Sequence, residues 1–125
     1  MSIRSNAVKW LSTHHKNASG IVVTTKYYTP EKSWPKKHVW WPTVSKQKIE
    51  TTADKYINIV SEKLPASNDF YYLKVPVMFF KNHLKQFHIV KSKTISMYLS
   101  ANKNNLFEEI RGTGKLDFSQ FMIST

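Results

Sequence analysis

The chain has 125 residues, of which 19 are Lys or Arg and 8 are Asp or Glu, so its formal net charge at pH 7 is +11. Hydrophobic residues make up 41% of the chain, which is enough to form a packed core and argues against general disorder. The absence of cysteine excludes a disulfide framework, a cysteine-ligated zinc or iron–sulfur centre and a cysteine nucleophile.

The length of the chain predicts one domain spanning residues 1–125. No apolar run reaches the roughly 18 residues that a membrane-spanning helix needs, so we expect no membrane partner. The first six residues lack the charged and then apolar layout of a secretory signal. We therefore expect a cytoplasmic protein.

The N-terminal segment is expected to form an amphipathic helix of about three turns. Its apolar positions fall on one helical face and are Ile3, Ala7, Trp10, Leu11 and His14. A serine at position 2 or 5 can cap the start of this helix, and Gly20 lies beyond its end.

A β-hairpin is expected to follow. Residues 20–29 are almost all β-branched or aromatic and predict a strand that Pro30 ends. Residues 38–41 predict its partner strand, and residues 30–37 predict the loop between them. Because Trp40 and Trp41 point to opposite faces of a strand, we expect only one of them to face the core of a one-layer sheet.

The middle of the chain predicts a long helix over residues 49–64, because its apolar residues recur at helical spacing. Residues 65–69 predict a turn and residues 70–75 a strand. Pro76 is suited to open the short helix that we expect next.

The last forty residues are expected to form a meander with turns at residues 102–105 and 112–114. Its strands are predicted over residues 94–100 and 106–111, and residues 116–123 are expected to form either a strand or a helix. The resulting order is α-β-β-α-β-α-β-β-β. This order predicts an α+β fold with a mostly antiparallel sheet and helices packed on one face.

Catalytic motifs are absent from the sequence. Residues 112–115 (Gly-Thr-Gly-Lys) lack the upstream glycine and the following Ser or Thr of a phosphate-binding loop, which favours a hairpin turn. Glu108 and Glu109 face opposite sides of a strand, so only one of them can join Asp117 in a metal site. No two histidines have the spacing of a helical metal site. We therefore expect no catalytic residue, no metal ion and no cofactor.

The basic charge is concentrated at the N-terminal end. Residues 1–48 hold nine Lys or Arg against a single acid, Glu31, whereas residues 49–125 hold ten against seven. Only Arg4 and Arg111 are arginine, and lysine lacks the planar fork that reads guanine edges, so sequence-specific base recognition is disfavoured. The many Lys, Asn and Ile residues are also typical of a low-GC coding sequence, which fits a phage or other mobile-element gene.

The candidate binding site is the predicted hairpin, where basic and aromatic residues alternate. Its residues are Lys26, Tyr28, Lys32, Trp34, Lys36, Lys37, His38 and Trp41. Lysines that follow a phosphate backbone, together with aromatic faces on which bases stack, are typical of single-strand nucleic-acid binding. The same tryptophans can instead pack in the core, or can contact a protein partner.

Three functions therefore stay open. The leading hypothesis is a small accessory protein that binds nucleic acid non-specifically through this hairpin. The second is a protein-interaction module or homodimer that uses the aromatic residues, and the third is a metal-independent nuclease whose His, Lys and Tyr residues converge in space.

Overall fold

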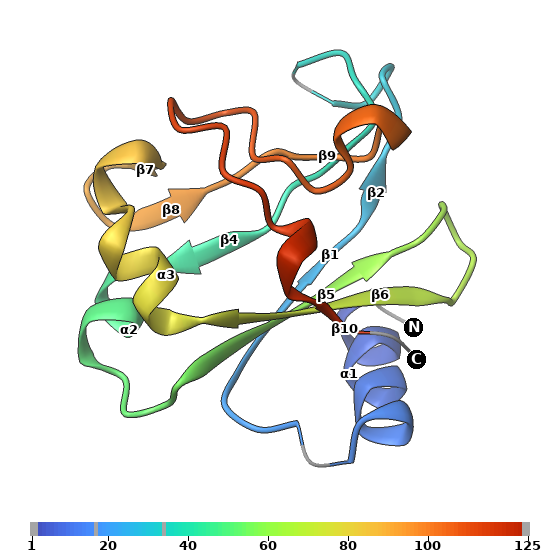
Figure 1. The fold of residues 1–125 in the computed structure, drawn as a ribbon. Coiled ribbons are helices and arrows are strands. Elements are labelled where there is room, and N and C mark those ends of the chain that lie inside the picture. Colours follow the sequence, from blue (N-terminus) through green and yellow to red (C-terminus); the bar gives the residue numbers. More distant parts are fainter. Residues whose placement is uncertain (1–2, 17, 34, 124–125) are drawn as a thin grey trace.

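The computed structural model describes residues 3–16, 18–33 and 35–123 of the chain (Figure 1). Within these residues the α-helices are α1 (Ile3–His14), α2 (Lys46–Thr51) and α3 (Val77–Asn82). The short 3-10 helices are η1 (Leu84–Gln86), η2 (Lys103–Asn105) and η3 (Ser119–Phe121). The strands are β1 (Ile21–Thr25), β2 (Tyr27–Tyr28), β3 (Val39–Trp40), β4 (Thr43–Ser45), β5 (Tyr56–Glu62), β6 (Phe70–Pro76), β7 (His88–Val90), β8 (Thr94–Ser96), β9 (Leu99–Ser100) and β10 (Met122–Ile123). None of these described helices is both long enough and apolar enough to cross a membrane.

The strands form three sheets with the orders β1-β5-β6-β10, β2-β3-β9 and β4-β8-β7. The pairing of β1 with β5 is parallel, and the other pairings between the described strands are antiparallel. One residue separates β1 from β2 and two separate β3 from β4, so two bent strands pass from sheet to sheet. Figure 1 shows the sheets curving around a shared interior. The predicted α+β fold with mostly antiparallel strands is confirmed.

The main core collects side chains from all three sheets. Trp40, Ile59, Leu73 and Phe107 are each 1% exposed or less. The ring of Trp40 stacks on that of Phe107 with 4.5 Å between centroids. Its Nε1 donates to the backbone carbonyl of Glu62 at 2.6 Å. Because this bond satisfies the only polar atom of the indole, Trp40 can be buried completely.

Helix α1 packs on the face of the first sheet that points away from the main core, which confirms the predicted N-terminal helix. Ala7, Trp10 and Leu11 are buried there against Val60 and Phe70, in a second and smaller core. Ala7, Trp10 and Leu11 of the predicted stripe therefore face the sheet, whereas His14 is exposed and the side chain of Ile3 lies outside the described residues. The charged residues Arg4 and Lys9 also face solvent.

The predicted helix over residues 49–64 is wrong. Helix α2 ends at Thr51, and the chain continues as the central strand β5. Ile57 and Ile59 face the main core, whereas Val60 faces α1. A strand that is buried on both faces loses its polar–apolar alternation, so its apolar residues can coincide with a helical spacing.

The predicted hairpin is present in a shorter form. Strand β2 pairs with β3 so that Tyr27 lies opposite Trp40, whereas the first half of the predicted strand, β1, joins the first sheet. Trp40 is 1% exposed and Trp41 is 41% exposed. The expected division of the two tryptophans between interior and surface is therefore confirmed.

The part of the chain after residue 69 agrees with prediction in part. The strand and short helix expected on either side of Pro76 are present as β6 and α3. The strand predicted over residues 106–111 is reduced to isolated bridges, because Phe107 adopts a φ of 63° that a strand does not allow. This conformation places the Phe107 ring in the main core.

Candidate functional site

Most basic residues of the predicted site lie on a compact loop between β2 and β3, whereas Lys26 lies between β1 and β2. The buried Oγ of Ser33 donates to the carbonyl of Lys37 at 2.7 Å and accepts from the N–H of the same residue at 3.0 Å. The backbone N–H groups of Lys32 and Ser33 each donate to the carbonyl of Thr29 at 3.0 Å. These bonds hold the backbone of the loop around Lys36 and Lys37 in place.

A surface cavity of about 350 Å³ lies between this loop and the turn after β9. The loop contributes three basic side chains, those of Lys36, Lys37 and His38. The other side contributes neutral polar groups and an apolar residue, and these are Ser100, Asn102, Asn105 and Ile110. No acidic side chain lines the cavity among the described residues, so its chemistry favours an anion that also accepts or donates neutral hydrogen bonds.

The asparagine-rich turn is held by its own side chains. Asn102 accepts a bond from the N–H of Asn104 through Oδ1 at 3.0 Å, which caps the first turn of η2. The Oγ of Ser100 donates to Oδ1 of Asn105 at 2.8 Å and accepts from the N–H of Asn102 at 3.1 Å. The side-chain nitrogen of Asn105, Nδ2, forms no hydrogen bond to the described residues. It is therefore available to a ligand.

Two ionisable groups border the basic side of the cavity. The Nδ1 of His38 lies 2.8 Å from the hydroxyl of Tyr27, and burial raises the pKa of that hydroxyl. The pKa of Glu31 is lowered, first by a hydrogen bond with its own backbone, then by one with Thr29 and by the nearby His38 and Lys36. Glu31 is therefore ionised at neutral pH and offsets part of the positive charge of the loop.

Aromatic residues and one arginine form a group beside the cavity, which we call the aromatic group: Tyr28, Trp41, Tyr98 and Arg111. The ring centroid of Trp41 lies 6.1 Å from that of Tyr28 and 5.7 Å from that of Tyr98. The guanidinium of Arg111 lies 4.6 Å from the centroid of the Tyr98 ring. Oγ of Ser96 accepts from Nε1 of Trp41 at 2.7 Å and from Nη1 of Arg111 at 2.8 Å. These contacts hold the half-exposed indole in one orientation.

The buried carboxylate of Glu109 supports the aromatic group from beneath. Its Oε2 accepts from the backbone N–H groups of Tyr98 and Arg111 at 2.9 Å each, and its Oε1 accepts from that of Gly112 at 2.6 Å. Glu108 instead lines a separate surface cavity together with Asp117, with which its backbone pairs. The two glutamates do face opposite sides, as expected, and Glu109 has a structural role.

The cavity and the aromatic group lie on one face of the β2-β3-β9 sheet. Tyr28, Val39 and Ser100 stand opposite one another across the three strands and therefore project from the same face. Ser100 lines the cavity and Tyr28 contacts Trp41, so the two features are neighbours. We call this surface the outer face, because Trp40 projects from the other face into the main core.

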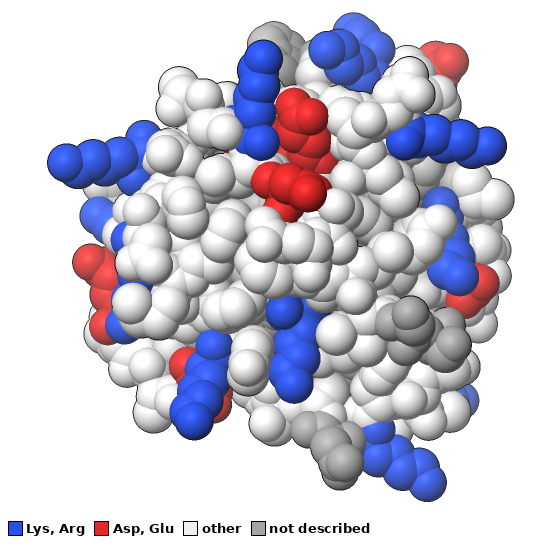
Figure 2. Space-filling model, in the orientation of Figure 1, with Lys and Arg blue, Asp and Glu red and all other residues white. Residues whose placement is uncertain are grey.

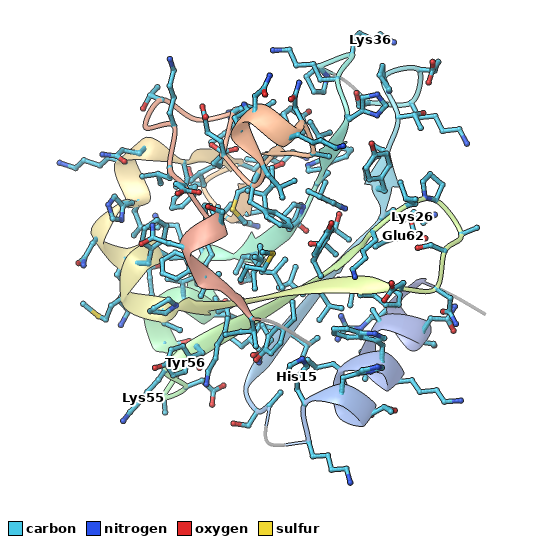
Figure 3. The ribbon with its side chains drawn as sticks, turned by 45° about the vertical axis from the view of Figure 1, so that its right-hand side comes forward. His15, Lys26, Lys36, Lys55, Tyr56 and Glu62 are labelled. Atoms are coloured by element: carbon cyan, nitrogen blue, oxygen red, sulfur yellow. The ribbon has the colours of Figure 1, made fainter. Side chains whose placement is uncertain are left out.

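The structure divides the predicted site residues into three sets. Lys36, Lys37 and His38 meet at the cavity, and Tyr28 and Trp41 belong to the aromatic group. Lys26 and Lys32 are exposed but do not line the cavity, and Figure 3 shows Lys26 well separated from Lys36. Trp34 lies outside the described residues. Four residues of the outer face were not predicted as site residues from the sequence: Tyr98, Asn102, Asn105 and Arg111.

Basic residues do not form one continuous patch on the face that Figure 2 shows. Figure 2 shows lysine and arginine side chains spread around the visible face, with neutral surface or acidic side chains between them. On this face, the positive charge is therefore distributed. Any local affinity for a polyanion must come from particular groups such as the cavity and the aromatic group.

The histidines are only partly gathered. His14 and His15 line a cavity of about 340 Å³ together with Lys16, Tyr72 and Lys74. Nδ1 of His14 lies 2.9 Å from the carbonyl of Trp10, and Nε2 of His15 is buried with no hydrogen-bond partner among the described residues. The other histidines lie elsewhere: His38 in the hairpin loop, His83 after α3 and His88 in β7.

No group of three or more His, Asp or Glu side chains that can hold a metal ion is present in the part of the chain that the structure describes. No protein-family model matches the chain, and comparison with curated proteins and with solved structures gives no match either.

Proposed function

We propose that this protein binds single-stranded nucleic acid, without sequence preference, on the outer face of the β2-β3-β9 sheet. The observation that supports this most directly is the exposed ring of Trp41 beside a cavity lined by Lys36, Lys37 and His38. Stacking on an aromatic ring and neutralisation of phosphate by lysine are the two contacts that non-specific single-strand binders combine.

Each group of the outer face has a part in this proposal. Lys36 and Lys37 neutralise the phosphates of a strand that crosses the cavity. An unstacked base lies on Trp41, whose ring is already held in place by its bond to Ser96. The side-chain amide of Asn105 offers hydrogen bonds to base edges. Because lysine is a point charge and a π-face is common to every base, little sequence preference follows.

The proposal is tested by fluorescence anisotropy of labelled single strands of about 16 nucleotides. We expect Trp41→Ala to weaken binding roughly 5- to 100-fold, which corresponds to the loss of one stacked base. Lys36→Ala combined with Lys37→Ala is expected to weaken binding to DNA and RNA strands alike. The matched control is Lys81→Ala combined with Lys85→Ala, two exposed lysines that do not line the cavity.

Three outcomes would contradict the proposal. Binding that does not fall with rising salt would exclude phosphate contacts. Equal losses in the control variant would show that only the distributed charge matters. An absence of oligonucleotide binding, together with dimers in light scattering, would favour the protein-interaction alternative instead.

The metal-independent nuclease stays a separate alternative at the cavity of His14 and His15. Loss of labelled RNA in the presence of EDTA would support it, provided that His14→Ala and His15→Ala abolish the loss. Intact RNA would count against it.

A further inference from the structure

Two sheet edges face each other without being paired. Among the described strands, β1 pairs only with β5, and β4 pairs only with β8. A cavity of about 290 Å³ lies between the free edges of β1 and β4 and is lined by residues of both. We call this arrangement the seam.

The free edge of β1 can be assigned residue by residue. Nη1 of Arg4 donates to the carbonyl of Val22 at 3.3 Å, so this carbonyl points away from β5. Backbone groups alternate in direction along a strand, and therefore those of Thr24 also point into the seam. The backbone groups of Val23, between them, point toward β5.

The free edge of β4 is set by the two hydrogen bonds that flank this strand. The N–H of Met97 donates to the carbonyl of Pro42 at 3.1 Å, and the N–H of Lys46 donates to that of Lys93 at 2.9 Å. Positions 42, 44 and 46 therefore face β8. The backbone groups of Thr43 and the N–H of Ser45 point the other way, into the seam. The carbonyl of Ser45, the N-cap of α2, instead accepts the first hydrogen bond of that helix.

Strands β1 and β4 continue the two strands of the β2–β3 ladder, but they have moved apart and no longer pair with each other. The register of β2 with β3 places Tyr27 opposite Trp40, and its extension would place Thr24 opposite Thr43. The strands part at Thr25, whose Oγ1 accepts from the N–H of Trp41 at 2.9 Å and donates to the carbonyl of Lys26 at 3.0 Å. A side-chain hydroxyl thus takes the place of a direct ladder bond at this point. Beyond it, backbone groups point into the seam from two directions. Among the described residues, they are the N–H groups of Val22, Thr24, Thr43 and Ser45 and the carbonyls of Thr24 and Thr43, whereas the Val22 carbonyl is covered by Arg4.

The charge of the seam indicates what it would accept. Arg4 and Lys48 line it, and no acidic residue does so among the described residues. A second copy of this chain carries a net charge of +11 and is therefore a poor occupant. An extended segment with acidic side chains would bond to the free backbone groups and pair with both cations.

We propose that the seam binds an extended acidic segment of another protein as an added β-strand between β1 and β4. Main-chain hydrogen bonds give such complexes their affinity, and side-chain pairing gives them their specificity. Arg4, which now covers the carbonyl of Val22, would release it to a peptide N–H and turn to an acidic side chain. The inserted strand would join the first and third sheets into one.

The probe is a synthetic peptide of about ten residues in which threonine and glutamate alternate, since strands of that length span such an edge. Binding is followed by nuclear magnetic resonance on the complete protein. We expect hydrogen exchange at the amides of Val22, Thr24, Thr43 and Ser45 to slow at least ten-fold when peptide is added. The amide of Val23, which faces β5, is expected to be protected with and without peptide.

Charge and backbone are then tested separately. Arg4→Glu combined with Lys48→Glu is expected to weaken peptide binding at least ten-fold, whereas Lys81→Glu in α3 is expected to leave it within two-fold of the original protein. A peptide that is N-methylated at every second residue should bind at least ten-fold more weakly, because one of its two edges then lacks N–H donors and can no longer pair with β1 or with β4. Absence of saturable binding, unchanged exchange at the four amides, or equal binding of the methylated peptide would each overturn the proposal.

Discussion

Replacement of Glu109 by alanine is expected to lower the free energy of unfolding by about 3–5 kcal/mol. The carboxylate of Glu109 is 1% exposed and accepts three backbone N–H groups, those of Tyr98, Arg111 and Gly112. The Tyr98 N–H is buried, and leaving it unpaired costs about 1–3 kcal/mol. The N–H groups of Arg111 and Gly112 are partly accessible to water, so the loss of each of these hydrogen bonds costs about 1 kcal/mol.

The measurement is urea-induced unfolding followed by tryptophan fluorescence, with Glu108→Ala as the matched control. The side chain of Glu108 accepts no hydrogen bond from the described residues and is half-buried, so its removal should cost no more than about 0.5 kcal/mol. Glu109→Gln keeps one acceptor oxygen, so its loss of unfolding free energy should lie between those of Glu109→Ala and Glu108→Ala. If Glu109→Ala and Glu108→Ala differ by less than about 0.5 kcal/mol, the role assigned to the buried carboxylate is wrong.

Further predictions concern pH, packing and the start of the seam. Burial raises the pKa of Tyr72 and of Tyr27, so both contribute stability that is complete below about pH 10 and is lost as pH rises through the raised values. The urea concentration at the unfolding midpoint should therefore decrease as pH rises above about 10, and this decrease should be smaller in Tyr72→Phe. In Gly112→Ala the added Cβ would lie 2.0 Å from the backbone oxygen of Gln86, so we expect a loss of roughly 2 kcal/mol or more in the same assay. Thr25→Val removes two hydrogen bonds and should lower the free energy of unfolding by about 1–2 kcal/mol; an unchanged midpoint would contradict the replacement of a ladder bond by this hydroxyl.

Elements with a strong local signal could be predicted from the sequence. Helix α1 has a single apolar stripe, and Pro76 marks the boundary between β6 and α3. Strand β5 could not be recognised, because its two faces are both buried and its apolar spacing matches a helix. The β-branched residues Ile57, Ile59 and Val60 were the signal that favours a strand there.

The candidate site could be predicted only on the side that is local in sequence. Lys36, Lys37 and Trp41 belong to one hairpin, where a dense run of basic and aromatic residues marks them. Asn105 and Arg111 reach the outer face through the pairing of β3 with β9, which joins positions about sixty residues apart and leaves no local pattern. An asparagine-rich segment predicts a turn equally well without a ligand.

The distribution of charge leads to a last quantitative prediction, on the salt dependence of oligonucleotide binding. For a single strand, log K falls against log salt with a slope of about −0.7 for each phosphate that is neutralised. Contacts from Lys36, Lys37 and one further cation of the outer face, such as Arg111, predict a slope of about −2. If all of the net charge of +11 acted on the ligand, the slope would approach about −8.

Replacing Lys36 and Lys37 by alanine separates these two cases. The local site predicts that the slope falls by about 1.4, to well under half of its original size, whereas a distributed field predicts a change of less than a fifth. Replacing Lys81 and Lys85 by alanine should leave the slope unchanged if binding is local. A steep slope that all four substitutions reduce alike would mean that the chain attracts polyanions through its total charge. The outer face would then not be a specific binding site for nucleic acid.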